Sequence, residues 1–112
     1  MAITLYGIPN CDSIRKARQW LDEHGVVYTF HNYKTEGLDT RLLAEWLETL
    51  GWRAIVNTRG TTWRKLAISE SDMDQGNALP LIAANLSLIK RPLVTSPERV
   101  IIGLDDLRRA VS

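Results

Sequence analysis

The beginning of the chain changes periodicity twice, and this order constrains the fold more than any other feature of the sequence. Ile3 to Tyr6 is a short run of apolar and β-branched residues that ends at the turn-forming segment 7–10. From Asp12 to His24 apolar residues recur every three or four positions, which predicts a helix that stops at Gly25. Val27 to Asn32 is rich in aromatic and β-branched residues and predicts a second strand. A strand, a helix and a strand in this order imply a right-handed crossover between parallel strands.

The middle of the chain is expected to be helical. Leucines and a tryptophan repeat with helical spacing from Leu42 to Leu50, which predicts a helix with Asp39 as its N-cap and Gly51 as its end. A polar turn is predicted over residues 57–62, followed by a short helical piece over residues 63–66.

The last part of the chain returns to strands. A helix is predicted over residues 77–85, with Pro80 expected in its first turn, where a missing N–H is tolerated. Two short β runs, 93–95 and 100–102, predict a hairpin, and residues 104–111 predict a closing helix. The fold class is therefore α/β, with a mixed four-stranded sheet covered by helices, as in thioredoxin-like proteins.

Composition limits the class of protein. With 112 residues, 45% hydrophobic and 24% charged, the chain has the balance of a single globular domain over residues 1–112. A net charge of +1 argues against direct binding of nucleic acid, and no apolar run is long enough to span a membrane. One cysteine cannot form an intramolecular disulfide, and the N-terminus lacks the pattern of a signal peptide. We therefore expect a cytoplasmic protein.

The single cysteine, Cys11, stands where the first predicted strand has ended and the first predicted helix begins. The first amides of a helix lack internal partners and carry the positive end of the helix dipole, so this position stabilises a thiolate. Arg15 and Lys16 can add positive potential, whereas the carboxylate of Asp12 opposes it. The alternative is that Cys11 is a small apolar residue that only packs.

Three separated motifs carry a resemblance to a known family. They are GIPNCDSIRKA over residues 7–17, NTRG over residues 57–60 and IKRPLVTSPERVIIG over residues 89–103. Together they resemble the bacterial arsenate reductase and Spx-type (ArsC-like) family, and within it the short YffB-like branch of glutathione-dependent thiol reductases. The resemblance covers essentially the whole chain and implies a thioredoxin-like fold and oxidoreductase activity.

The resemblance also implies roles for individual residues. Cys11 takes the place of the family's nucleophile, while Arg59 and Arg91 take the places of its oxyanion-binding arginines. Pro92 stands where thioredoxin-like proteins usually carry a cis proline, and X–Pro is the peptide bond for which cis costs little. A turn can hold the rigid fork of Arg59 toward a pocket, although either arginine taken singly suits an exposed side chain or a structural ion pair. Contacts with the substrate are expected from the neighbouring residues Asn10, Asp12, Ser13, Arg15, Lys16 and Pro92.

Three positions depart from the family pattern. Asp12 follows the cysteine where the arsenate reductases have small and hydroxyl residues. Ser96 stands where they supply a third arginine before a proline, so arsenate itself is not the expected substrate. Ile14 stands where Spx-type proteins carry a second cysteine, which excludes an internal Cys-x-x-Cys switch.

The chemistry open to a single cysteine is restricted. The Cys11 thiolate is expected to attack either an oxyanion centre or the sulfur of a mixed disulfide, and an outside thiol must then resolve the adduct. Glutathione is the expected co-substrate and glutaredoxin a further partner, with no bound cofactor or metal. The alternative is an Spx-like regulatory protein that binds RNA polymerase without catalysis.

Overall fold

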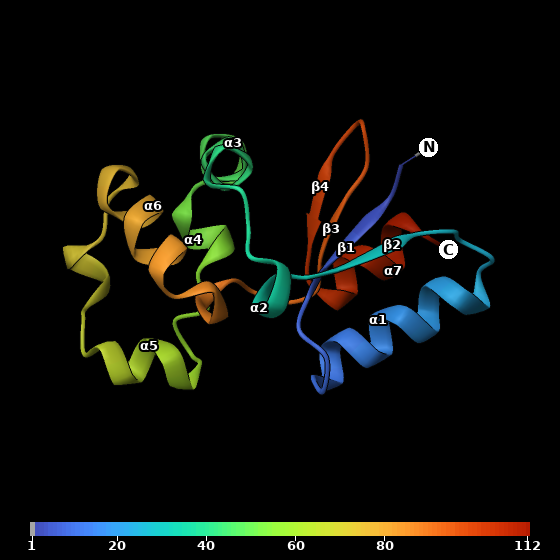
Figure 1. Cartoon of the computed structure of the whole chain (residues 1–112), viewed down its shortest axis with the longest axis horizontal. Coiled ribbons are helices and arrows are strands. Elements are labelled where there is room, and N and C mark those ends of the chain that lie inside the picture. Colours follow the sequence, from blue (N-terminus) through green and yellow to red (C-terminus); the bar gives the residue numbers. More distant parts are fainter. Residues whose placement is uncertain (1) are drawn as a thin grey trace. The chain divides into compact units, whose positions relative to one another are not determined.

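A mixed sheet organises the computed structural model, which describes residues 2–112 (Figure 1). Its four strands lie in the order β2-β1-β3-β4. Strands β1 and β2 are parallel, whereas β3 is antiparallel to both β1 and β4. The strands are β1 (Thr4–Gly7), β2 (Thr29–Asn32), β3 (Leu93–Thr95) and β4 (Val100–Ile102). The predicted parallel start, late hairpin and mixed four-stranded sheet are thus confirmed.

The chain divides into two compact units. The sheet unit consists of the residues up to Gly37 together with Arg91–Ser112, and the helical unit consists of Leu38–Lys90. The organisation of residues 1–112 as a single domain stays a prediction. Among residues 2–112, no helix combines the length and the apolar character that crossing a bilayer requires.

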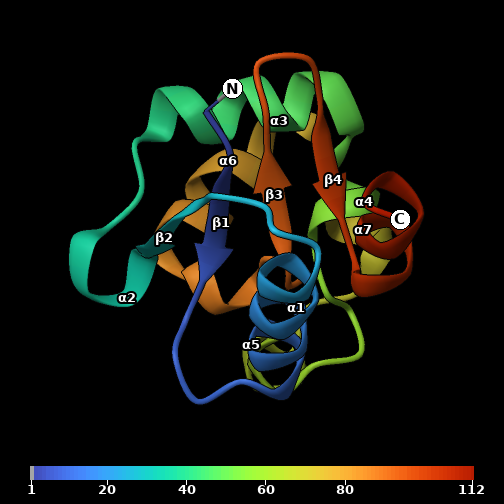
Figure 2. The same cartoon turned by 90° about the vertical axis from the view of Figure 1, so that its right-hand side faces the viewer.

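Three helices belong to the sheet unit: α1 (Asp12–Glu23), α2 (Tyr33–Glu36) and α7 (Leu104–Ala110). Helix α1 lies across the sheet (Figure 2), because its apolar stripe faces the strands. The core that results joins α1, α7, β1 and β3, and consists of Leu5, Ile14, Ala17, Leu21, Val94 and Leu107. Burial of this stripe explains why the helical spacing after the cysteine predicted α1 so closely.

The close approach of β1 to α1 depends on a glycine. A Cβ atom on Gly7 would overlap the side chain of Ile14, which is only 2% exposed. Glycine therefore ends the strand here because only a residue without a side chain fits beneath the first turn of α1.

The helical unit contains α3 (Thr40–Leu50), α4 (Trp52–Ile55), α5 (Thr61–Leu66) and α6 (Gln75–Ala84). The bounds of α3 agree with the prediction, since Asp39 caps it by accepting a hydrogen bond from the Arg41 amide and Gly51 ends it. Two short 3₁₀ turns, η1 (Glu70–Asp72) and η2 (Leu86–Leu88), complete the unit. Its core contains three of the tryptophans, Trp46, Trp52 and Trp63, which are all buried.

The expectation for Pro80 is wrong. Helix α6 begins at Gln75 rather than at Asn77, so Pro80 lies in its second turn. The earlier start comes from a capping box, in which Asp74 and Asn77 each accept a hydrogen bond from the other's backbone amide. This cap and the burial of Ala78 and Ile82 hold the helix despite the missing proline N–H.

Candidate thiol active site

The sheet topology brings three chain segments to one edge. In the parallel pair Gly7 is opposite Asn32, so the carboxyl ends of β1 and β2 lie side by side. In the antiparallel pair Tyr6 is opposite Leu93, which places the amino end of β3 at the same edge. The segments that follow β1, follow β2 and precede β3 therefore meet there.

Each of these segments contributes one chemically active side chain. Cys11 comes from the segment after β1, Tyr33 directly follows β2, and Arg91 precedes β3. The charges of Arg91 and of Cys11 both act on the Tyr33 hydroxyl, so the three groups form one cluster. Sequence analysis had singled out Cys11 and Arg91 but had missed Tyr33.

Tyr33 is the most buried member of the cluster. Its side chain is 2% exposed, and its hydroxyl has no hydrogen-bond partner among residues 2–112. Burial raises the pKa of Tyr33, and the charge of Cys11 raises it further, against the opposing effect of Arg91. The opposing effect of Arg91 comes from a side-chain hydrogen bond to the hydroxyl and from its charge, so the two groups are neighbours, although their contact falls outside strict hydrogen-bond geometry. At neutral pH the hydroxyl keeps its proton and is a donor.

Arg91 presents a second unpaired donor in the cluster. Its Nη1 atom is buried and also lacks a hydrogen-bond partner among the described residues. An unpaired buried donor costs about 1–3 kcal/mol, and more when the group is charged. The peptide bond between Arg91 and Pro92 is cis, in the place where the sequence resemblance put a cis proline.

Cys11 is the N-cap residue of α1 and is partly buried. Its side chain makes no capping hydrogen bond, and its carbonyl accepts the amide of Arg15 at 2.9 Å. Asp12, in the first turn, pairs with the guanidinium of Arg15, and both side chains are exposed. Sequence analysis expects the Asp12 carboxylate to oppose a thiolate at Cys11. The ion pair with Arg15 offsets part of this negative charge.

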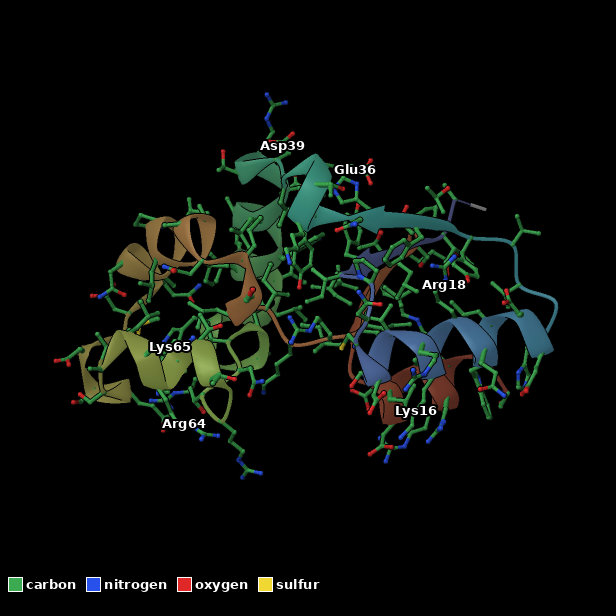
Figure 3. The ribbon with its side chains drawn as sticks, turned by 60° about the horizontal axis from the view of Figure 1, so that its bottom comes forward. Lys16, Arg18, Glu36, Asp39, Arg64 and Lys65 are labelled. Atoms are coloured by element: carbon green, nitrogen blue, oxygen red, sulfur yellow. The ribbon has the colours of Figure 1, made fainter. Side chains whose placement is uncertain are left out.

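A pocket of about 510 Å³ extends from Cys11 along the exposed side of α1. The predicted substrate residues Asn10 and Arg15 line it, and so does Arg18, which sequence analysis had missed. Figure 3 shows Arg18 directed toward β2 and Lys16 on the other side of the helix. The Arg18 guanidinium lies 4.6 Å from the centre of the Phe30 ring. The pocket therefore places two cationic side chains beside the thiol, and the acidic side chains of Asp22 and Glu23 line it as well.

The ArsC family model matches residues 6–108. The chain belongs to the ArsC family. Among solved structures, the YFFB protein is 40% identical with a TM-score of 0.88, and the match covers 99% of this chain and 100% of that one. An arsenate reductase related protein from Brucella melitensis is 43% identical with a TM-score of 0.78, over 93% and 88% of the two chains. These neighbours agree with the predicted thioredoxin-like fold.

Regulators of transcription are also similar to this chain. The global transcriptional regulator Spx from Streptococcus agalactiae is 36% identical over 93% of this chain and 77% of its own length. The comparisons thus confirm the resemblance that the three motifs carried, and they include both arsenate reductase-like proteins and Spx proteins.

Arg59, the other arginine implied by the ArsC resemblance, belongs to the helical unit. It is exposed, and its backbone is held in the turn before α5: its amide donates to Asn57 Oδ1 at 3.1 Å and its carbonyl accepts from Arg64 Nη2 at 2.9 Å. Gly60 allows this turn to close, because a Cβ atom there would lie 2.9 Å from the Asn57 side-chain amide. The partnership of Arg59 with Cys11 stays a prediction.

Two of the three departures from the ArsC family pattern have structural reasons. Ile14, in the place of a second cysteine, is a core residue packed beneath β1. Ser96, in the place of a third arginine, forms the β3–β4 turn: its amide donates to the Arg99 carbonyl, and its hydroxyl lies 3.4 Å from the Glu98 amide. Both positions are therefore used by the fold.

Neither histidine contributes to a metal site in this ArsC-family chain. His24 Nδ1 lies 2.8 Å from the Trp20 carbonyl, and His31 Nε2 lies 2.7 Å from the Gly37 carbonyl. Within residues 2–112 there is no group of three or more His, Cys, Asp or Glu side chains placed to hold a metal ion.

Proposed function

We propose that this ArsC-family chain is a glutathione-dependent thiol reductase in which the Cys11 thiolate is the nucleophile. The observation that carries the proposal is the cluster at the sheet edge, where a cysteine at a helix N-terminus lies with a partly buried cation and a neutral buried hydroxyl. A thiolate is the reactive form of cysteine, and charged or dipolar donors around it favour that form.

The first step is an exchange of disulfide bonds. The Cys11 sulfur attacks the glutathionyl sulfur of a mixed disulfide R–S–S–G, so that a bond forms between Cys11 and glutathione. The bond between the two substrate sulfurs breaks, and the departing R–S group takes the electron pair and then a proton. Cys11 is left as a mixed disulfide with glutathione.

The second step restores the enzyme. Because Ile14 occupies the place of a resolving cysteine, the electrons must come from outside the chain. The thiolate of a second glutathione attacks the glutathionyl sulfur on Cys11, which yields oxidised glutathione and the free Cys11 thiolate. Glutaredoxin is an alternative electron donor. In total, R–S–S–G and one glutathione become R–SH and oxidised glutathione.

Two of the four charged side chains that line the pocket suit this co-substrate, and the other two, Asp22 and Glu23, are acidic. Glutathione carries two carboxylates, and Arg15 and Arg18 line the pocket that extends from Cys11. Guanidinium groups bind carboxylates through paired hydrogen bonds. Arg59 and Arg91 are proposed to hold the negative charge of the reacting centre, as in the oxyanion-binding role that the family resemblance implies.

A turnover assay tests the proposal. Purified protein, a glutathione mixed disulfide, glutathione, glutathione reductase and NADPH are combined, and NADPH oxidation is followed by absorbance. We expect turnover that Cys11→Ser abolishes, together with a glutathione adduct on Cys11 detected by mass spectrometry. Wild-type turnover no faster than that of Cys11→Ser would overturn the proposal, and so would the absence of an adduct.

The similarity to Spx supports a second candidate, an Spx-like regulatory protein that binds RNA polymerase without catalysis. Its test is capture of purified RNA polymerase by the wild-type chain and by Cys11→Ser. Equal capture by both, with no turnover in the assay above, would favour the regulator. Either function needs Cys11 as a free thiol, and free thiols persist in a reducing compartment. We therefore propose that the protein acts in the cytoplasm.

A further inference from the structure

We propose that Arg18 and Asp22 bind the α-amino acid group at the γ-glutamyl end of glutathione, so that the pocket along α1 selects glutathione among the disulfides that Cys11 attacks. In this arrangement the Arg18 guanidinium receives the α-carboxylate, and the Asp22 carboxylate receives the α-ammonium. The inference rests on the proposed function and deepens it, because it names the part of the co-substrate that is recognised and the residues that recognise it.

The charged side chains of the pocket follow one face of α1. Arg15, Arg18 and Asp22 come after Cys11 at intervals of three or four residues, and all four residues line the pocket. With increasing distance from the thiol the pocket therefore offers cations first and carboxylates next. Arg18 and Asp22 are one helical turn apart, with about 5–6 Å between their Cβ atoms. An α-amino acid group carries both charges on one carbon, so a single such group can contact both side chains.

Arg18 is the cation of the pocket that is both oriented and free of a carboxylate partner. Arg15 pairs with Asp12, whereas Arg18 forms no salt bridge within residues 2–112. The Arg18 Nε atom donates to the Tyr28 hydroxyl at 3.1 Å, and its guanidinium lies 4.6 Å from the centre of the Phe30 ring. These two contacts hold the guanidinium on the β2 side of α1 (Figure 3) and leave its two Nη atoms available to a carboxylate.

Asp22 is the carboxylate of the pocket that lacks a partner. Glu23 Oε1 accepts a hydrogen bond from Gln19 Nε2 at 3.0 Å, whereas the Asp22 side chain makes no hydrogen bond or ion pair with any described residue. Asp22 also lies in the last turn of α1, where the negative end of the helix dipole adds to its charge. This end of the pocket therefore attracts a cation, which the ammonium of an α-amino acid group supplies.

The spacing along the helix fits the γ-glutamyl end of glutathione. Arg18 follows Cys11 by seven residues, which corresponds to about 10 Å along a helix axis. A disulfide covers about 4 Å between its two Cβ atoms, and two extended residues cover about 7 Å. A glutathionyl group on Cys11 therefore reaches Arg18 with its γ-glutamyl end. The glycine end of glutathione carries a carboxylate but no ammonium, so only the γ-glutamyl end matches both charges.

The rate at which Cys11 becomes glutathionylated tests this subsite without a complete turnover. The probes are glutathione disulfide, its N-acetylated derivative, which keeps every carboxylate but lacks the ammonium, and cystine, whose α-amino acid group lies beside the sulfur. In each case the Cys11 sulfur forms a bond to one probe sulfur, the bond between the two probe sulfurs breaks, and one thiolate departs with the electron pair. Adduct formation is followed by mass spectrometry, and each rate is divided by that of free cysteine with the same probe.

Wild type is expected to react about twofold to fivefold faster with glutathione disulfide than with the N-acetylated derivative, which is the range for an exposed ion pair. Asp22→Asn should slow the reaction with glutathione disulfide and remove this preference. Because glutathione is negatively charged overall, simple repulsion by Asp22 would have the opposite sign, and Asp22→Asn would then react faster.

Two further variants complete the test. Arg18→Gln should slow the reactions with both glutathione probes, since both keep the α-carboxylate, and should leave the reaction with cystine unchanged. The matched control is Asp105→Asn, which removes an exposed carboxylate of the sheet unit that does not line the pocket. This control should leave the preference of wild type intact.

A reaction with glutathione disulfide that Asp22→Asn speeds or leaves unchanged would overturn the inference. An equal loss with cystine would also overturn it, because Asp22 would then act on Cys11 itself rather than on the γ-glutamyl end. The preference, found in a protein that fails the turnover assay, would support the subsite and refute the proposed function. Turnover without the preference would refute the subsite alone.

Discussion

At the scale of single residues, the contact between Gly7 and Ile14 decides what can stand in the first turn after the cysteine. Ile14 is buried beneath the end of β1, and the absence of a side chain at Gly7 makes room for it. The position that a second cysteine would take therefore belongs to the core. The proposed reaction depends on an outside thiol because the chain has no second cysteine to resolve the adduct.

Gly7→Ala is expected to destabilise the protein by about 1–3 kcal/mol, because the added methyl group overlaps a packed side chain. Free energies of unfolding in urea, measured for Gly7→Ala, Ile14→Val and the double variant, test this. Ile14→Val removes Cδ1, the nearer of the two Ile14 atoms that the new methyl group would overlap, and keeps Cγ1, so the overlap is partly relieved and the combined loss should be smaller than the sum. Strict additivity would contradict the overlap.

The raised pKa of Tyr33 predicts that the stability of the protein falls at alkaline pH. Its pKa in the folded chain is raised above the ordinary value of 10.0, first by burial, so the unfolded chain loses this proton at a lower pH than the folded chain does. The stability that Tyr33 contributes is therefore complete below pH 10 and is lost as the pH rises through the folded pKa.

Urea unfolding of wild type and Tyr33→Phe at neutral pH and above about pH 10 measures this effect, since the groups that the two chains share cancel in the difference. The free energy of unfolding of wild type minus that of the variant should fall as the pH rises. Tyr28→Phe, which alters a partly buried tyrosine, is the control. A difference that stays constant, or one that grows with pH, would contradict the raised pKa.

At the scale of elements, helices whose ends are set by local capping residues could be predicted from the sequence, whereas very short helices could not. Helix α3 has a side-chain cap at Asp39 and a glycine end at Gly51, and both signals are local. Helices α2 and α4 have four residues each, too few to show a period, and sequence analysis missed them. Pro80 was misplaced because the capping box of Asp74 and Asn77 moved the start of α6.

Asp39→Ala is expected to cost about 1 kcal/mol, because the Arg41 amide loses the side-chain oxygen that accepts its hydrogen bond. Asp39→Asn keeps an oxygen acceptor at the same place and should cost much less. Thermal and urea unfolding of both variants measure the difference. Equal losses for Ala and Asn would point to the charge of Asp39 rather than to the cap.

At the scale of the whole molecule, the open question is whether the two compact units unfold together. Residues 1–112 are predicted to be a single domain, and small single domains usually unfold in one cooperative step. The chain offers a way to observe one unit by itself, because Trp20 belongs to the sheet unit whereas Trp46, Trp52 and Trp63 belong to the helical unit.

In a Trp20→Phe background, fluorescence reports only on the helical unit. If the chain is one cooperative domain, adding Gly7→Ala in the sheet unit should lower the midpoint of this fluorescence transition by as much as it lowers the midpoint seen by circular dichroism. The measurement compares the two midpoints in urea for the same protein. A fluorescence midpoint that Gly7→Ala leaves unchanged would show that the units unfold independently.

By itself the sequence determined the order of the strands and of the longer helices, the bounds of α3, the hairpin and the position of Cys11, because periodicity, caps and turn residues act over a few neighbouring positions. Only the tertiary structure decided which side chains join Cys11. Tyr33 directly follows a strand that no local signal links to the cysteine, and Arg91 lies far along the chain from both. They meet because parallel and antiparallel pairing bring three strand ends to one edge, and such long-range pairing leaves no trace in the neighbouring residues.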